Sequence, residues 1–232
     1  MTESLRYPVT LLKQKRTHIQ ISCTPDFTIL VKAPFWASKR LISDFLVSKQ
    51  EWIEQTMSLY KHNQAMIFPN PIVYGSSFYY LGTAYNIVLM TTQQQLLYFE
   101  NDSFVVCLHD VFNQTLLRRS LIHWYKEMAL DLFLKRLDFW KEKMNVCVNK
   151  VIVKQFKARW GSCSIQKNIS LNWILIKAPI DIIDYVIVHE CCHLVYFNHS
   201  KQFWELVKQF IPDYKQKKQW LKQYGVFLLQ NH

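Results

Sequence analysis

The sequence predicts an α+β fold with a β-rich N-terminal region and a more helical C-terminal half. Short runs in which apolar and polar residues alternate are frequent in residues 1–112, a pattern typical of strands with one buried face. Residues 113–232 instead carry apolar residues mainly at helical spacing. Half of the 232 residues are hydrophobic, so the chain can bury a large core. We therefore expect two regions, with a soft boundary near residue 112.

The N-terminal region is expected to begin with a hairpin and a helix. Residues 18–22 and 27–32 each alternate and are separated by turn residues, which predicts two antiparallel strands. Ser38 is a favourable N-cap for an amphipathic helix over residues 39–60. A loop with prolines and a glycine follows. Four short strands are then expected at residues 78–81, 85–90, 96–99 and 104–108.

The C-terminal half is expected to begin with one long helix over residues 114–143, because an apolar stripe runs through that segment. The strand expected at residues 169–176 could be an interior strand or an edge to which an extended peptide adds. Further elements are a strand at 150–157, a turn at 159–164, a helix after Pro179, and helices from Ser200 and Pro212.

The most informative motif is His189-Glu190-Cys191-Cys192-His193, which is followed six residues later by His199. Residues four apart lie on the same face of a helix, so His189 and His193 can bind one metal ion. The helix around them is apolar on nearly all sides and should be buried, where unpartnered imidazoles would be costly. His199 is a credible third ligand if the helix ends near Phe197 and the chain turns back through a left-handed Asn198.

Three protein ligands and one open position are typical of catalytic zinc. We therefore expect a zinc-activated water, with Glu190 as the general base that accepts its proton. The oxyanion of the reaction needs a further donor. Arg159, Tyr185 and Tyr196 are the candidates, and the residue pattern does not rank them. Arg159 could equally form a structural ion pair.

Composition and charge limit the classes of partner. The net charge of +11 favours anionic partners such as nucleic acid, nucleotides or acidic peptides, although basic runs are more often solvated faces. Four glycines and no Gly-rich phosphate motif argue against a dinucleotide or P-loop enzyme. The six cysteines form no C-x-x-C pair, and no apolar run approaches a membrane span or a signal segment. We expect a cytoplasmic protein without a membrane partner.

Several motifs together resemble the YgjP-like metallopeptidase family. They are Arg159-Trp160-Gly161-Ser162-Cys163-Ser164, Asn168-Ile169-Ser170-Leu171-Asn172-Trp173, Lys177-Ala178-Pro179, the metal motif, and Asn198-His199-Ser200-Lys201-x-Phe203-Trp204, with weaker matches at Val31-Lys32-Ala33-Pro34 and Lys49-x-x-Trp52-Ile53. The resemblance implies a zincin-like catalytic domain over residues 113–232, similar to SprT-type proteases. It also implies His189, His193 and His199 as zinc ligands and Glu190 as catalytic acid and base. Residues 1–112 would then form a β-rich layer that shapes substrate access.

Two positions depart from the family pattern: Cys191 stands where leucine is more usual, and Phe27 where glycine is. Three functions remain open. The first is a zinc-dependent metallopeptidase that acts on a peptide or protein. The second is a metal-dependent nucleoside triphosphate (phosphoanhydride) hydrolase, because an activated water can attack phosphorus and the net charge suits an anionic substrate. The third is a nucleic-acid-associated protein with structural zinc, which usually has four ligands rather than three.

Overall fold

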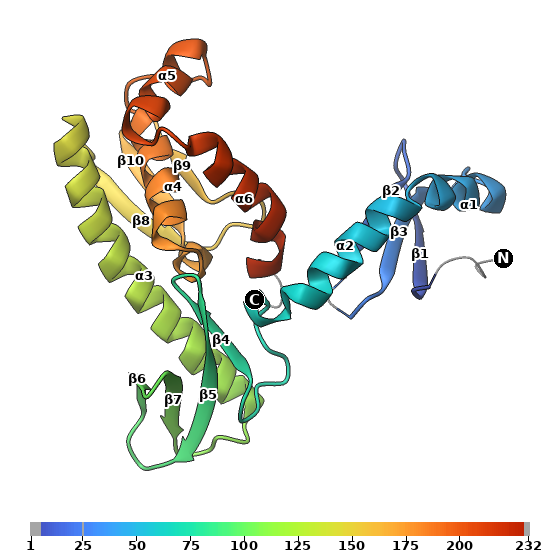
Figure 1. Ribbon diagram of the computed structural model, residues 1–232, viewed down its shortest axis with the longest axis horizontal. Helices are drawn as coiled ribbons and strands as arrows, with labels where there is room; N and C mark the ends of the chain where they lie inside the picture. Colours follow the sequence, from blue (N-terminus) through green and yellow to red (C-terminus); the bar gives the residue numbers. More distant parts are fainter. Residues whose placement is uncertain (1–5, 25, 230–232) are drawn as a thin grey trace. The chain divides into compact units, whose positions relative to one another are not determined.

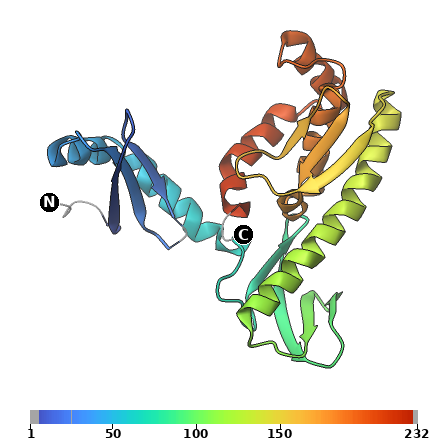
Figure 2. The ribbon, with the colours of Figure 1, turned by 180° about the vertical axis from the view of Figure 1, so that it is seen from behind.

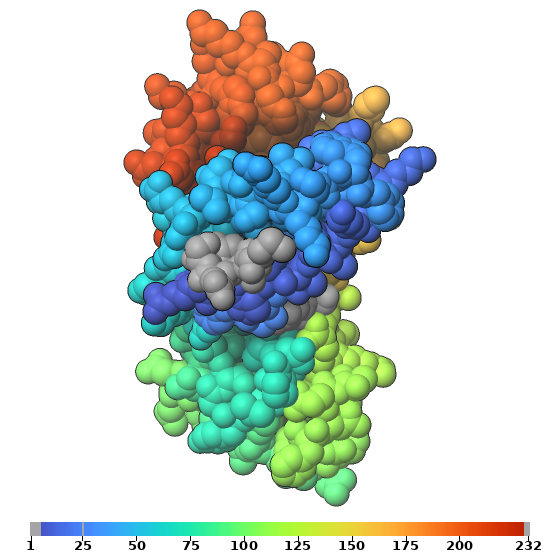
Figure 3. All heavy atoms as spheres, turned by 90° about the vertical axis from the view of Figure 1, so that its right-hand side faces the viewer, coloured from blue at the N-terminus to red at the C-terminus, as the bar shows by residue number. Residues whose placement is uncertain are grey.

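The computed structural model describes residues 6–24 and 26–229, and these residues form three small sheets and six α-helices (Figures 1 and 2). The chain divides into two compact units, residues 1–64 and 65–232. Figure 3 colours the first unit from blue to cyan and the second from turquoise to red. The division falls after Gln64, whereas the sequence suggested a boundary near residue 112. The mixed α+β class that the sequence predicted agrees with these elements.

The first unit contains a three-stranded sheet in the order β1-β3-β2. Strands β2 (Gln20–Cys23) and β3 (Ile29–Pro34) are antiparallel, which confirms the predicted hairpin. Strand β1 (Val9–Gln14) pairs in parallel with β3 and was not predicted, because its side chains are mostly exposed and show no clear alternation of burial. Phe27, between β2 and β3, has a positive φ of 58°. A glycine there would adopt this backbone conformation without strain.

The helix expected over residues 39–60 is two helices, α1 (Lys39–Ser48) and α2 (Gln50–His62). They divide at Lys49, whose φ of −110° and ψ of 8° lie outside the helical region. Ser38 caps α1 as predicted, because its side chain accepts a hydrogen bond of 3.1 Å from the Leu41 N–H. A short 3₁₀ turn, η1 (Gln64–Met66), lies where the two units divide.

The second unit begins with a four-stranded sheet in the order β4-β5-β7-β6, and all four strands were predicted. Phe78 and Phe104 stack on this sheet with ring centroids 3.8 Å apart, and Tyr125 of the following helix stacks on Phe78 at 4.6 Å. This shared aromatic core explains why the chain does not divide near residue 112. The strands are β4 (Ser77–Tyr80), β5 (Thr83–Thr91), β6 (Leu96–Glu100) and β7 (Ser103–Leu108).

Helix α3 (Gln114–Met144) is the longest element of the chain, as expected from its apolar stripe. The Asn113 side chain caps its start by accepting a hydrogen bond of 3.1 Å from the Leu116 N–H. Asn145 ends it in the left-handed conformation, with a φ of 51°. Figure 2 shows that α3 runs from the first sheet of this unit to the second.

The second sheet of this unit has the order β8-β10-β9. The strand predicted at residues 169–176 is therefore interior rather than an edge, and it is shorter than expected. It comprises β10 (Asn168–Asn172), and the remaining residues form the 3₁₀ helix η2 (Trp173–Lys177). The segment expected to be a turn contains the edge strand β9 (Gly161–Cys163), which is antiparallel to β10. The parallel neighbour is β8 (Lys150–Lys154).

Three helices complete the second unit: α4 (Ile180–Cys192), α5 (Lys201–Phe210) and α6 (Tyr214–Leu228). Helix α4 is held to α3 by the Arg136 guanidinium, which donates two hydrogen bonds of 2.7 and 2.5 Å to the Asp184 carboxylate. At the start of α4, Asp181 pairs with Lys217 of α6. No helix in the described residues combines the length and apolarity that crossing a membrane requires.

Candidate metal centre

Helix α4 carries the His-Glu-x-x-His motif through the interior of the second unit. Ile183, Ile187 and Val188 are fully buried, as expected for a helix that is apolar on nearly all sides. The helix ends at Cys192 with His193 as its C-cap, earlier than the expected end near Phe197. After the helix, the chain forms hydrogen-bonded turns, and one of these bonds, 2.9 Å long, runs from the Tyr196 N–H to the Cys192 carbonyl. The imidazoles therefore project from the last turn of α4.

The three predicted histidines come together in space. The nitrogen atoms that His189, His193 and His199 can offer to a metal lie within 4.8 Å of one another. The Nε2 atoms of His189 and His199 are 3.1 Å apart. Two nitrogens bound to one tetrahedral zinc at 2.0–2.1 Å would be about 3.3 Å apart, so this spacing fits a zinc ion.

The segment between α4 and α5 brings His199 to the other two histidines. Ser200 caps α5 as predicted, because its Oγ accepts a hydrogen bond of 3.3 Å from the Phe203 N–H. This cap helps to fix the position of His199, which directly precedes Ser200. Asn198 is not among the residues with positive φ, so the expectation that it would leave the helix in a left-handed conformation was wrong. The hydrogen-bonded turns after Cys192 redirect the chain instead.

Burial keeps His189 and His193 in the neutral form that binds metals. It lowers the pKa of His189 to about 3, and the neighbouring His193, His199 and Lys218 add to this effect. Burial also lowers the pKa of His193. A neutral imidazole presents a lone pair that can bind zinc.

Hydrogen bonding also selects which nitrogen of His193 faces the cluster. Its Nδ1 lies 3.1 Å from the Tyr196 backbone carbonyl. A carbonyl only accepts, so Nδ1 carries the proton and Nε2 is left as the ligand atom. The buried Nδ1 of His189 has no such partner among the described residues.

Glu190 lies beside the histidines with only 5% of its surface exposed. Burial raises the pKa of its carboxyl to about 8, and the positive charge of Arg159 opposes this rise. Strand β9 runs directly against the carboxyl group. A Cβ atom at Gly161 would lie 2.6 Å from Glu190 Oε1, so only glycine leaves room for the side chain as it stands. Sequence reasoning missed this role, although Gly161 stands in the quoted Arg159–Ser164 motif.

A pocket of about 350 Å³ opens beside Glu190 and His189. Of the candidate oxyanion donors, Arg159 and Tyr185 line it, whereas Tyr196 does not. Burial raises the pKa of Tyr185 to about 12, so its hydroxyl stays protonated and can donate. Arg159 forms no ion pair with a carboxylate of the described residues. The complete lining is Arg159, Trp160, Gly161, Tyr185, Val186, His189, Glu190, Lys218, Leu221 and Lys222.

Comparison with known proteins identifies the family. The model of the YgjP-like metallopeptidase domain matches residues 17–224, which is most of the chain. The chain belongs to the YgjP-like family. This membership makes it a metallohydrolase at the level of the family. No curated protein matches. Among solved structures, the metallopeptidase zymogen abylysin of Pyrococcus abyssi is similar at 19% identity and a TM-score of 0.36, over 39% of this chain and 93% of that chain.

Proposed function

We propose that this YgjP-like protein is a zinc-dependent metallopeptidase. The observation that carries the proposal is the convergence of three ligand nitrogens within 4.8 Å, with a buried carboxyl from the adjacent residue of the same helix. His189, His193 and His199 would hold the metal and leave one coordination position open. The family is one of metallopeptidases, and a donor set of three imidazoles suits zinc.

The bound metal would supply Lewis-acid chemistry, which acidifies a water molecule and polarises the substrate carbonyl. Glu190 would accept the proton of that water and pass it to the leaving amine. The positive charge held by the histidines would lower the pKa of Glu190 and favour the ionised form that a base requires. Its burial beside Gly161 would fix the carboxylate in one position.

The substrate would bind along the edge of the second sheet. Strand β9 is an edge strand that contacts Glu190 through Gly161, so an extended peptide added there would pass the metal centre. Strand β9 therefore takes the role that the sequence offered to the strand at residues 169–176, because β10 is interior. Arg159 and Tyr185 line the pocket and would donate to the oxyanion. Tyr196 is not part of this pocket, and its backbone carbonyl instead faces His193.

A second candidate function is hydrolysis of nucleoside triphosphates. It is favoured by the cations Arg159, Lys218 and Lys222, which line the same pocket and suit an anionic substrate. A structural zinc in a nucleic-acid-associated protein is less consistent with three ligands and an adjacent buried Glu190. A cytoplasmic location stays a prediction.

One experiment separates the two hydrolytic functions. The zinc-loaded chain would be incubated with unstructured proteins such as casein, with quenched fluorescent peptides, and with a panel of nucleoside triphosphates. We expect new amino termini from the proteins and peptides. Release of phosphate or pyrophosphate, without peptide cleavage, would replace the peptidase proposal with the phosphoanhydride hydrolase. The metal-free chain is the control, and it should cleave neither class.

A further inference from the structure

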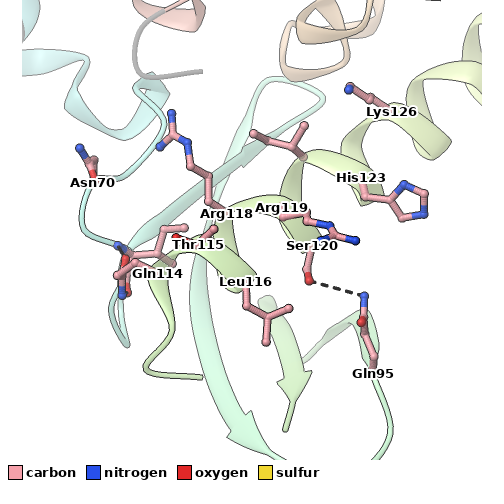
Figure 4. Close-up of a pocket in the computed structure, with 12 residues that line it drawn as sticks. Asn70, Gln95, Gln114, Thr115, Leu116, Arg118, Arg119, Ser120, His123 and Lys126 are labelled. Carbon is pink, nitrogen blue, oxygen red and sulfur yellow. Dashed lines mark hydrogen bonds between the residues drawn. The ribbon is translucent and has the colours of Figure 1, made fainter. Parts of the chain in front are cut away.

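A second and larger hollow lies on the N-terminal half of α3, within the second unit. Its volume is about 1080 Å³, and it shares no lining residue with the pocket at the metal centre. Figure 4 shows the residues that line it. Helix α3 forms its floor between residues 114 and 126. We call this feature the α3 groove.

Hydrogen bonds tie both walls of the α3 groove to its floor. On one side, the Ile72 N–H donates to Gln114 Oε1 at 2.7 Å, and Gln114 Nε2 donates back to the Ile72 carbonyl at 2.9 Å. On the other side, Gln95 Nε2 donates to Ser120 Oγ at 3.5 Å. Ser120 is itself buried. The groove is therefore a formed feature of the fold with walls on both sides of α3.

The α3 groove is basic. Arg118, Arg119, His123 and Lys126 line it, and none of the lining residues is acidic. In Figure 4, Arg118 extends toward the segment that carries Asn70, whereas Arg119 leaves α3 toward the other side. Cationic side chains thus reach both sides of the groove.

The charges of Arg119 and Lys126 are not neutralised within the described residues. Arg119 and Lys126 form no ion pair with a carboxylate of the described residues. His123 lies 3.3 Å from the exposed carboxylate of Glu127, one turn along the helix. The Arg118 guanidinium lies 5.1 Å from the centre of the Phe68 ring.

We propose that the α3 groove binds an acidic segment of a polypeptide. Its volume is just above the usual range for small-ligand pockets, so it can take a stretch of extended chain. Arg119 and Lys126 are two helical turns apart, which corresponds to about 10.5 Å along the axis. Carboxylates four residues apart on an extended peptide lie on one face and are separated by about 13 Å, a span that the long, flexible Arg119 and Lys126 side chains can cover.

The lining chemistry favours a polypeptide over single-stranded nucleic acid. None of the lining residues that the structure describes is Phe, Tyr or Trp, and stacking of bases on such rings is a main source of affinity for single strands. The side-chain amide of Asn70 and the hydroxyl of Thr115 are instead available for the amide groups of a peptide backbone. The binding does not depend on the metal chemistry. A role in holding peptide substrates rests on the proposed function.

The test measures peptide binding rather than hydrolysis. The full chain would carry Glu190→Gln throughout, so that cleavage does not remove the ligand. Fluorescence anisotropy would report binding of a short labelled peptide rich in glutamate, and of a matched peptide with glutamine at the same positions. The groove variant is Arg119→Ala with Lys126→Ala. Its control is Lys150→Ala with Lys208→Ala, which removes the same charge from exposed positions outside both pockets.

We expect the glutamate peptide to bind and the glutamine peptide to bind far more weakly. The groove variant should weaken binding by about tenfold, the combined effect of losing two exposed cation–carboxylate contacts, and the control should change it by less than about twofold. Equal losses in both variants would overturn the proposal, because binding would then follow net charge alone. It would also be overturned if the glutamate peptide does not bind, or if a single-stranded oligonucleotide binds more tightly and loses affinity in the groove variant.

Discussion

Gly161→Ala tests whether the position of Glu190 controls activity. The new Cβ would lie 2.6 Å from Glu190 Oε1 and 2.8 Å from both Cδ and Cγ. Carbon atoms in van der Waals contact need about 3.5 Å, so the carboxyl must move by roughly 0.7–0.9 Å. A misplacement of about 1 Å at a reacting group can cost on the order of 10²-fold in rate. We therefore predict that kcat falls by about 10–100-fold, while the three histidines still hold the metal.

The assay is turnover of a peptide that the parent cleaves, measured together with metal content. Ser162→Ala is the matched control, because it changes the next residue of the same strand without adding an atom beside Glu190. It should keep turnover within a few-fold of the parent. Two results would refute the reasoning: full activity in Gly161→Ala, or a loss of metal in parallel with the loss of turnover.

Two further predictions concern stability. Arg136→Ala should lower the free energy of unfolding by about 2 kcal/mol, because its pair with Asp184 is mostly buried, with 27% and 13% of the side chains exposed. Urea titration measures both effects. Lys135→Ala removes an exposed ion pair on the same helix and should lower the free energy of unfolding by less than about 0.5 kcal/mol. Equal losses of stability in the two variants would contradict the prediction. Burial lowers the pKa of Lys177 to about 7 from 10.5. Between these two pH values the unfolded chain therefore binds more protons than the folded chain. The free energy of unfolding of the parent, relative to that of Lys177→Met, should then rise by roughly 1 kcal/mol per pH unit from pH 7 to 10.5. A difference that stays constant with pH would refute this prediction.

The grouping of the three histidines was predictable because much of its geometry is local. The spacing of His189 and His193 places them on one helical face, and Ser200 caps the helix that follows His199. A few residues of sequence therefore carry most of the information about this cluster. The four strands of the second unit and the long helix were predictable for the same reason, since their apolar periods lie within each segment.

Other features depend on contacts between distant segments. The closeness of Gly161 to Glu190 joins a sheet edge to a helix, and no periodicity within either segment contains it. Strand β1 has few buried side chains, so it lacks the alternation by which strands are recognised. The β4–β7 sheet belongs to the same unit as helix α4, because the β4–β5 turn is bound to η2, where the Gly82 N–H donates to the Lys177 carbonyl at 2.9 Å.

The most direct test of the proposed chemistry is turnover per bound metal in Glu190→Gln. Glutamine preserves size and most hydrogen bonding but cannot accept a proton from water. We predict a metal content of about one per chain, as in the parent, with turnover lower by roughly 10²–10⁴-fold. His199→Ala is the comparison, because removal of a ligand should reduce metal affinity and activity together. Parental turnover in Glu190→Gln would contradict the assignment of Glu190 as the general base.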